Sequence, residues 1–193
     1  MDYNNVQDHL GKIYASIGEQ FSYGHTALDT IHTEVTDSSI SISFFNQNDI
    51  YKVLNQINSV IANLANLKDC LKQKLTQRGD KPEIIEDEIN NLPYLQVILD
   101  LSNQEKHNKY PLTKTRRSKK DPLIKNVGRS LSPLNNPDNI RYQKSSGSAI
   151  VNMMVKITAD ITDSQGNILY RLDDLVENAL GDWEQIIKKY KII

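Results

Sequence analysis

One feature constrains the fold of this chain most: an apolar stripe that repeats every three or four residues between residues 50 and 75. Its members are Ile50, Val53, Leu54, Ile57, Ile61, Leu64, Leu71 and Leu75. This spacing puts one hydrophobic face on a helix, and that face has to pack against other elements. Asn46, Asn48 and Asp49 are suitable N-cap residues, and Gly79 is a suitable end. We therefore predict one long amphipathic helix between these limits.

Three more stretches have helical periodicity. Residues 4–35 have apolar side chains at spacings of three, four and seven, and residues 172–190 repeat the pattern at the other end of the chain. Asp80 and Pro82 open a further helical stretch, which restarts at Pro93 and continues to about His107. We therefore predict that residues 1–193 form a single, mainly α domain in which these helices pack as a bundle.

Strand patterns are short and gather mainly before the last helix. Residues 40–44 alternate apolar and polar side chains, and so do residues 151–161, which a turn at DSQGN connects to a return strand at 168–170. Residues 108–147 contain four prolines and little periodicity, and we interpret them as a long, basic, partly mobile loop with at most a short strand. The bundle should thus carry a small β-hairpin or short sheet before its C-terminal helix.

Several classes of protein are disfavoured by what the sequence lacks. Cys70 is the only cysteine, which excludes an internal disulfide framework and cysteine-based zinc sites. The glycines form neither a GxGxxG nor a GxxxxGK phosphate loop, and GxSxG and HExxH are absent. No apolar run approaches membrane-spanning length, and the polar N-terminus does not resemble a secretory signal. We expect a cytoplasmic protein with no cofactor and no membrane partner.

Charge is strongly segregated along the chain. Residues 1–105 carry a net charge of −8, residues 106–144 carry +9 and residues 145–193 carry −2. Lysine and arginine neutralise phosphates and a tyrosine can stack on an unpaired base, so the basic segment predicts contact with single-stranded RNA or a nucleotide. The candidate contacts are Lys109, Tyr110, Lys114, Arg116, Arg117, Lys119 and Lys120. The alternative is a solvated loop whose basic side chains bind no nucleic acid.

The most suggestive polar residues lie at the end of the predicted helix over 93–107. Asp100, Asn103 and His107 share one helical face at this spacing. A histidine can take the proton of a ribose 2'-hydroxyl, an asparagine can bind the scissile phosphate, and Lys106 or Lys109 can stabilise the developing charge. Alternatively, Asn103 and His107 only cap the C-terminus of the helix.

The run Leu101-Ser102-Asn103-Gln104-Glu105-Lys106-His107 resembles the HEPN superfamily of helical RNA-cutting toxins and antiviral effectors. The family motif is an arginine, a polar residue that is often asparagine, three variable residues and a histidine. This chain has Ser102 at the arginine position. The resemblance implies a dimeric helical bundle with His107, Asn103 and Lys106 as catalytic residues, and the missing arginine implies weak or lost cleavage. An arginine at position 102 should return the cation to the helical face of the motif.

A second histidine pattern lies in the predicted first helix. His25, Asp29 and His32 are spaced so that they would form one stripe on a helix, which is a spacing that can bind a metal. Leu28 and Ile31 lie beside that stripe, and no fourth ligand is evident. We interpret the pattern as ordinary packing and predict no metal site.

These observations lead to two main functional hypotheses, and a metal-dependent enzyme built on the first helix ranks third after them. The first is a HEPN-like RNA- or nucleotide-binding homodimer, of a bacterial toxin, defence or stress system, with weak or lost endoribonuclease activity. The alternative is a non-catalytic helical protein whose apolar faces serve dimerisation or partner docking.

Overall fold

The computed structural model describes residues 6–21, 32–35, 40–43, 47–107, 117–133, 140–143, 148–151 and 153–192. It describes side chains for residues 6–15, 50–106, 117–129 and 157–192. Within these ranges the chain forms the following helices: α1 (Val6–Phe21), α2 (Gln47–Arg78), α3 (Glu83–Ile89), α4 (Pro93–His107) and α5 (Leu172–Lys189).

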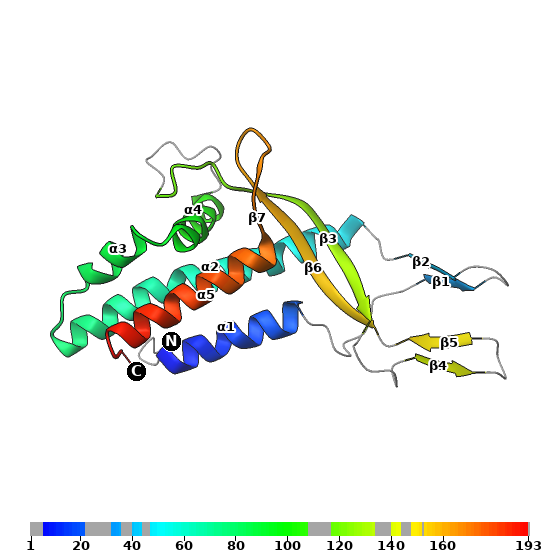
Figure 1. The fold of residues 1–193 in the computed structure, drawn as a ribbon, viewed down its shortest axis with the longest axis horizontal. Coiled ribbons are helices and arrows are strands. Elements are labelled where there is room, and N and C mark those ends of the chain that lie inside the picture. The colour runs from blue at the N-terminus through cyan, green and yellow to red at the C-terminus, as the bar shows by residue number, and fades with distance from the viewer. Residues whose placement is uncertain are drawn as a thin grey trace.

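The helices form a bundle whose longest member is α2. Figure 1 shows α1, α2 and α5 lying alongside one another, while α3 and α4 return along α2. Gly79 ends α2 because its φ of +85° is a left-handed conformation that lets the Asp80 N–H bond back to the Leu75 carbonyl oxygen at 2.9 Å. The single tryptophan, Trp183 on α5, is fully buried, and its Nε1 donates to the Leu64 carbonyl oxygen of α2 at 3.0 Å.

A three-stranded antiparallel sheet precedes α5. It contains β3 (Leu123–Pro133), β6 (Met153–Thr162) and β7 (Ile168–Arg171) in the order β3-β6-β7. Leu123 pairs with Thr162 at one end of the β3–β6 ladder and Pro133 pairs with Met153 at the other, with an irregularity between Lys125 and Gly128. Strand β7 runs directly into α5, so the sheet is joined covalently to the bundle.

Two smaller antiparallel pairs complete the described strands. They are β1 (His32–Val35) with β2 (Ile40–Ser43), and β4 (Ile140–Gln143) with β5 (Ser148–Val151). Both pairs lie beyond the three-stranded sheet, at the opposite end of the molecule from the α2–α3 connection (Figure 1). Within the described ranges, no helix has both the length and the apolar character needed to cross a membrane.

The predicted fold class is confirmed: the chain is mainly helical, with a small sheet before the C-terminal helix. The prediction for the last helix is accurate in detail, since its inward-facing residues are all buried: Leu172, Leu175, Val176, Ala179, Trp183, Ile186 and Ile187. The limits predicted for α2 are also confirmed. One member of its predicted apolar stripe, Ile50, is instead 38% exposed.

Two element predictions are wrong. A helix does not continue to residue 35, because residues 32–35 form β1 and pair with β2; residues 22–31 lie outside the described part. The region 108–147 contains more strand than predicted, since β3 alone has 11 residues and β4 follows. In both places a partner strand stabilises an extended backbone that local periodicity does not indicate: the neighbouring β2 for β1, and the more distant β6 for β3.

Candidate functional site

The predicted catalytic residues belong to the last two turns of α4. Asn103 and Lys106 are exposed, and the Lys106 ammonium donates to Asn66 Oδ1 on α2 at 3.3 Å. His107 is the final residue of the helix, and its side chain lies outside the described residues. The structure therefore places Asn103 and Lys106 at the surface, while the proposed role of His107 stays a prediction.

Asp100 has a structural role, although its spacing in the sequence places it on the helical face of Asn103 and His107. It is 2% exposed, and its carboxylate accepts hydrogen bonds from the Arg117 N–H at 3.1 Å and the Ser118 N–H at 3.0 Å. The Ser118 hydroxyl donates a further hydrogen bond to it at 2.5 Å. These donors compensate for burying a charge. Asp100 thus fixes a later segment of the chain to α4.

Ser102, at the position of the family arginine, faces the core. It is 2% exposed, and its Oγ has no hydrogen-bond partner among the described residues. Ser102 follows Leu95 by seven residues and Ile98 by four, so it continues the buried stripe of α4. The expectation that an arginine at position 102 would join the face of Asn103 is therefore wrong.

The described part of the basic segment is distributed among several environments. Arg117 forms a salt bridge with Glu86 of α3 through Nη2 and Oε2. Lys119 is exposed, with φ at +54°, and the Lys120 ammonium lies 5.6 Å from the centroid of the Tyr170 ring on β7. The other predicted RNA contacts, Lys109, Tyr110, Lys114 and Arg116, lie outside the described residues.

Both flanks of segment 108–116 are nevertheless defined. The segment leaves α4 after His107, and Arg117 returns to the same helix at Asp100. Seven helical residues separate these two points, which corresponds to about 10 Å along the axis of α4. The two ends of this basic segment are thus held along the part of α4 that also carries Asn103 and Lys106.

A cation cluster that the sequence did not indicate surrounds Glu86. Lys72 donates to Glu86 Oε1 at 2.9 Å, and the Lys68 ammonium lies 3.7 Å from the same oxygen. With Arg117 on Oε2, three cations share one carboxylate. Burial acts to raise the pKa of Glu86, but the hydrogen bonds from Lys72 and Arg117 and the charge of Lys68 together hold that pKa below its ordinary value.

Sequence reasoning missed this cluster for an identifiable reason. Lys68 and Lys72 are four residues apart on α2, a spacing that is common on solvated helix faces. Their carboxylate partner comes from α3 and their cationic neighbour from the segment after α4. Only the tertiary packing of the helix pairs brings these charges together.

The structure supplies no grouping of metal ligands in its described part. No set of three or more His, Cys, Asp or Glu residues there is arranged to hold a metal ion. His25 and Asp29 lie outside that part, and His32 begins β1. The continuous helix through residue 35 that would have aligned His32 with the other two residues is therefore not formed.

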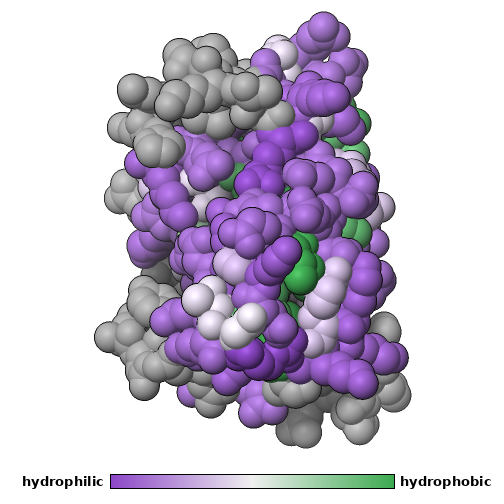
Figure 2. Space-filling view, turned by 90° about the vertical axis from the view of Figure 1, so that its left-hand side faces the viewer, coloured by the Kyte–Doolittle hydropathy of each residue, from purple (hydrophilic) through white to green (hydrophobic). Residues whose placement is uncertain are grey.

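The end of the bundle where α2 meets α3 is a polar surface. Figure 2 looks onto this end and shows mainly hydrophilic residues with a small hydrophobic area between them. Comparisons of the chain with protein-family models, with curated proteins and with solved structures found no match.

Proposed function

We propose that this chain is a HEPN-like, cytoplasmic RNA- or nucleotide-binding protein of a bacterial toxin, defence or stress system, with weak or lost endoribonuclease activity. The observation that carries the proposal is the attachment of Arg117 and Ser118 to Asp100. It fixes Arg117 and Ser118, at the start of the described part of the basic segment, to the helix that presents Asn103 and Lys106. Phosphate-neutralising residues and the motif residues thus belong to one region.

The proposed chemistry requires a base, a phosphate ligand and a cation. In this proposal His107 takes the proton of a ribose 2'-hydroxyl, Asn103 binds the scissile phosphate and Lys106 stabilises its developing charge. No metal or cofactor takes part. Lys106 is exposed, and among the described residues its ammonium binds a neutral amide oxygen and no carboxylate, so it is accessible to an incoming phosphate.

Weak or lost cleavage follows from the positions of the nearby cations. Residue 102 is a buried serine, and α4 contains no arginine. The motif helix therefore supplies no guanidinium beside Asn103. Arg117 is the nearest described guanidinium in the sequence, and it is already paired with Glu86. A solvated lysine stabilises the pentacoordinate phosphorus of the transition state less specifically than a bidentate arginine does.

The test uses purified protein and a fluorescently labelled single-stranded RNA without added metal. We expect weak RNA binding and slow or absent cleavage. His107→Ala should abolish any cleavage, and Asn103→Ala should reduce it to a lesser extent. Glu105→Ala, on an exposed residue of the same helix, is the matched control and should behave as the wild type. Cleavage that survives His107→Ala would refute the assignment of the site, and the absence of any RNA or nucleotide binding would refute the function.

One observation favours the alternative, a non-catalytic interaction protein. Ile50 and Tyr51, at the start of α2, are 38% and 71% exposed. Adjacent exposed apolar side chains of this size offer a contact surface to a second copy of the chain, and closed two-fold dimers are the commonest such assembly. Light scattering of the wild type and of Tyr51→Ser tests this: a dimer that the substitution weakens supports it, and a monomer at high micromolar concentration contradicts it.

A further inference from the structure

Lys68, Lys72 and Arg117 all form ion pairs with the same carboxylate, that of Glu86. Two of them come from adjacent turns of α2, and the third comes from the segment fixed to α4 by Asp100. Their side chains are 23%, 32% and 31% exposed, so they are partly shielded from water and still accessible from it. Among the carboxylates that the structure describes, Glu86 is the one that all three contact.

We propose that Lys68, Lys72 and Arg117 form a binding site for a phosphate group, and that the Glu86 carboxylate occupies this site when no phosphate is bound. The proposal does not depend on RNA binding at α4. It assigns a ligand class to a cluster that the α4 motif does not include.

The charges of the cluster leave a positive excess. The second carboxylate near it, Asp69, lies 3.6 Å from Lys68, but its side chain is 71% exposed and its charge is therefore well screened by water. Asp100, the other acid that contacts this segment, is already bound to N–H and hydroxyl donors. Three cations thus face one partly buried carboxylate, and an additional anion is electrostatically favoured.

The unused hydrogen-bond donors also fit a phosphate group. Each lysine ammonium has three N–H donors and the guanidinium has five. The Lys68 ammonium lies 3.7 Å from Glu86, which is beyond hydrogen-bond distance, and the Lys72 ammonium makes a single hydrogen bond in the described part of the chain. Glu86 offers two oxygens to three cations. A phosphate group offers more oxygens in a tetrahedral arrangement, so it can accept hydrogen bonds from all three cations at once.

The proposal makes Glu86 a competitor of the ligand, and this leads to effects of opposite sign. Removing a cation should weaken phosphate binding, whereas removing the negative charge of Glu86 should strengthen it. If the cluster is only a structural salt bridge, both substitutions lower stability and neither changes phosphate binding. The direction of the Glu86 effect therefore separates a binding site from a structural ion pair.

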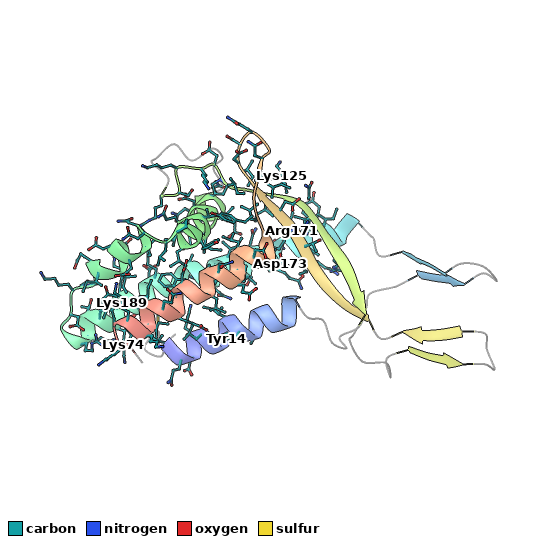
Figure 3. All side chains as sticks on the ribbon, in the orientation of Figure 1. Tyr14, Lys74, Lys125, Arg171, Asp173 and Lys189 are labelled. Carbon is teal, nitrogen blue, oxygen red and sulfur yellow. The ribbon has the colours of Figure 1, made fainter. Side chains whose placement is uncertain are left out.

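The experiment measures binding of inorganic phosphate by calorimetry at constant ionic strength in a buffer without phosphate. Lys72→Gln should weaken binding and Glu86→Gln should strengthen it, each by about 2- to 5-fold, the range that one partly exposed ion pair provides. Lys74→Gln and Asp87→Asn are the matched controls and should leave binding unchanged. Lys74 lies two residues from Lys72, about 200° around α2, and Figure 3 shows it on that helix near the α5 end that carries Lys189.

Two further measurements identify the source of the phosphate and keep the test valid if a variant does not fold. Adenosine monophosphate and an oligoribonucleotide without terminal phosphates replace inorganic phosphate in parallel titrations, so that a free phosphate, a nucleotide and an RNA backbone are distinguished. Nuclear magnetic resonance of the wild type should show phosphate-dependent shifts of the Lys68, Lys72, Glu86 and Arg117 amides, whether or not the variants fold.

Absence of binding at millimolar phosphate, or unchanged affinity in Glu86→Gln and Lys72→Gln, would overturn the proposal. Phosphate binding without RNA or nucleotide binding would refute the proposed function and leave this inference intact. RNA binding that is insensitive to Lys72→Gln, together with an absence of phosphate binding, would refute this inference and leave the proposed function intact.

Discussion

The carboxylate of Asp100 accepts hydrogen bonds from both the backbone N–H and the hydroxyl of Ser118, a residue 18 positions further along the chain. Asp100 is almost completely buried, and the Arg117 N–H is its third donor. One side chain in the middle of α4 therefore determines where the chain re-enters the bundle after segment 108–116. The positions of Arg117 at Glu86 and of Lys120 at Tyr170 follow this attachment.

Loss of this attachment should be costly. Asp100→Ala leaves the N–H groups of Arg117 and Ser118 without their acceptor, and we expect it to lower the free energy of unfolding by about 2–4 kcal/mol. Urea denaturation measures the loss, and hydrogen exchange should show faster exchange at these two amides than elsewhere in the bundle. Glu105→Ala on the same helix is the control. A loss no larger than that of the control would contradict the anchoring role of Asp100.

The burial of Ser102 leads to a second prediction. Ser102→Arg puts a guanidinium into the packed interior of the bundle, so we expect it to lower the free energy of unfolding by about 3–5 kcal/mol or to prevent folding. It should not increase RNA cleavage. Thermal denaturation together with the RNA assay tests both statements. A stable Ser102→Arg protein that cleaves RNA faster than the wild type would show that residue 102 faces the site.

The single tryptophan provides a direct test of the packing between α2 and α5. Trp183 is fully buried and bound to the Leu64 carbonyl oxygen, so its emission should lie at short wavelength and shift to longer wavelength on unfolding. Trp183→Phe removes volume and one buried hydrogen bond, which should cost about 2–3 kcal/mol. Tyr14→Phe, which removes an exposed hydrogen bond to Glu184, should cost less than about 1 kcal/mol. Equal costs would argue against this packing.

The lowered pKa of Glu86 predicts how stability depends on pH. The folded state holds the Glu86 proton less tightly than the unfolded chain, whose glutamate pKa is about 4.3. This contribution to stability is therefore complete above the unfolded pKa and is lost as pH falls through the folded value. Glu86→Gln should be less stable than the wild type at pH 7, and the difference should narrow as the pH falls below the unfolded glutamate pKa of about 4.3. A difference that stays constant from pH 7 to pH 3 would contradict the ion-pair account, and Asp87→Asn controls for the change in net charge.

The helical part of the fold was predictable because it is encoded locally. The stripe of α5, from Leu172 to Ile187, is buried as its spacing predicts. The spacing of Ser102 from Leu95 and Ile98 also predicts its burial, whereas the motif predicts that it shares the face of Asn103. Strands β1 and β3 were not predictable in the same way, because each depends on a partner strand and not on its own periodicity.

In the candidate site, too, the features set by local helix geometry were predictable, and those set by tertiary packing were not. The positions of Asn103 and Lys106 on one exposed part of α4 follow from helix geometry alone. The use of Asp100 as an anchor and the pairing of both Lys68 and Arg117 with Glu86 do not, because these contacts join residues that belong to different elements of the fold. Pair distances of this kind become visible only when the helices are packed.

The measurement that tests the central claim most directly is the salt dependence of single-stranded RNA binding. Phosphate contacts release counterions, so the logarithm of affinity should fall linearly with the logarithm of salt concentration, by about 0.7 for each contact with a single strand. The variant in which Arg116, Arg117, Lys119 and Lys120 are all glutamine should bind more weakly and give a shallower slope than the wild type. A quadruple variant that keeps the affinity and the slope of the wild type would contradict the claim that this basic segment, anchored at Asp100, binds RNA.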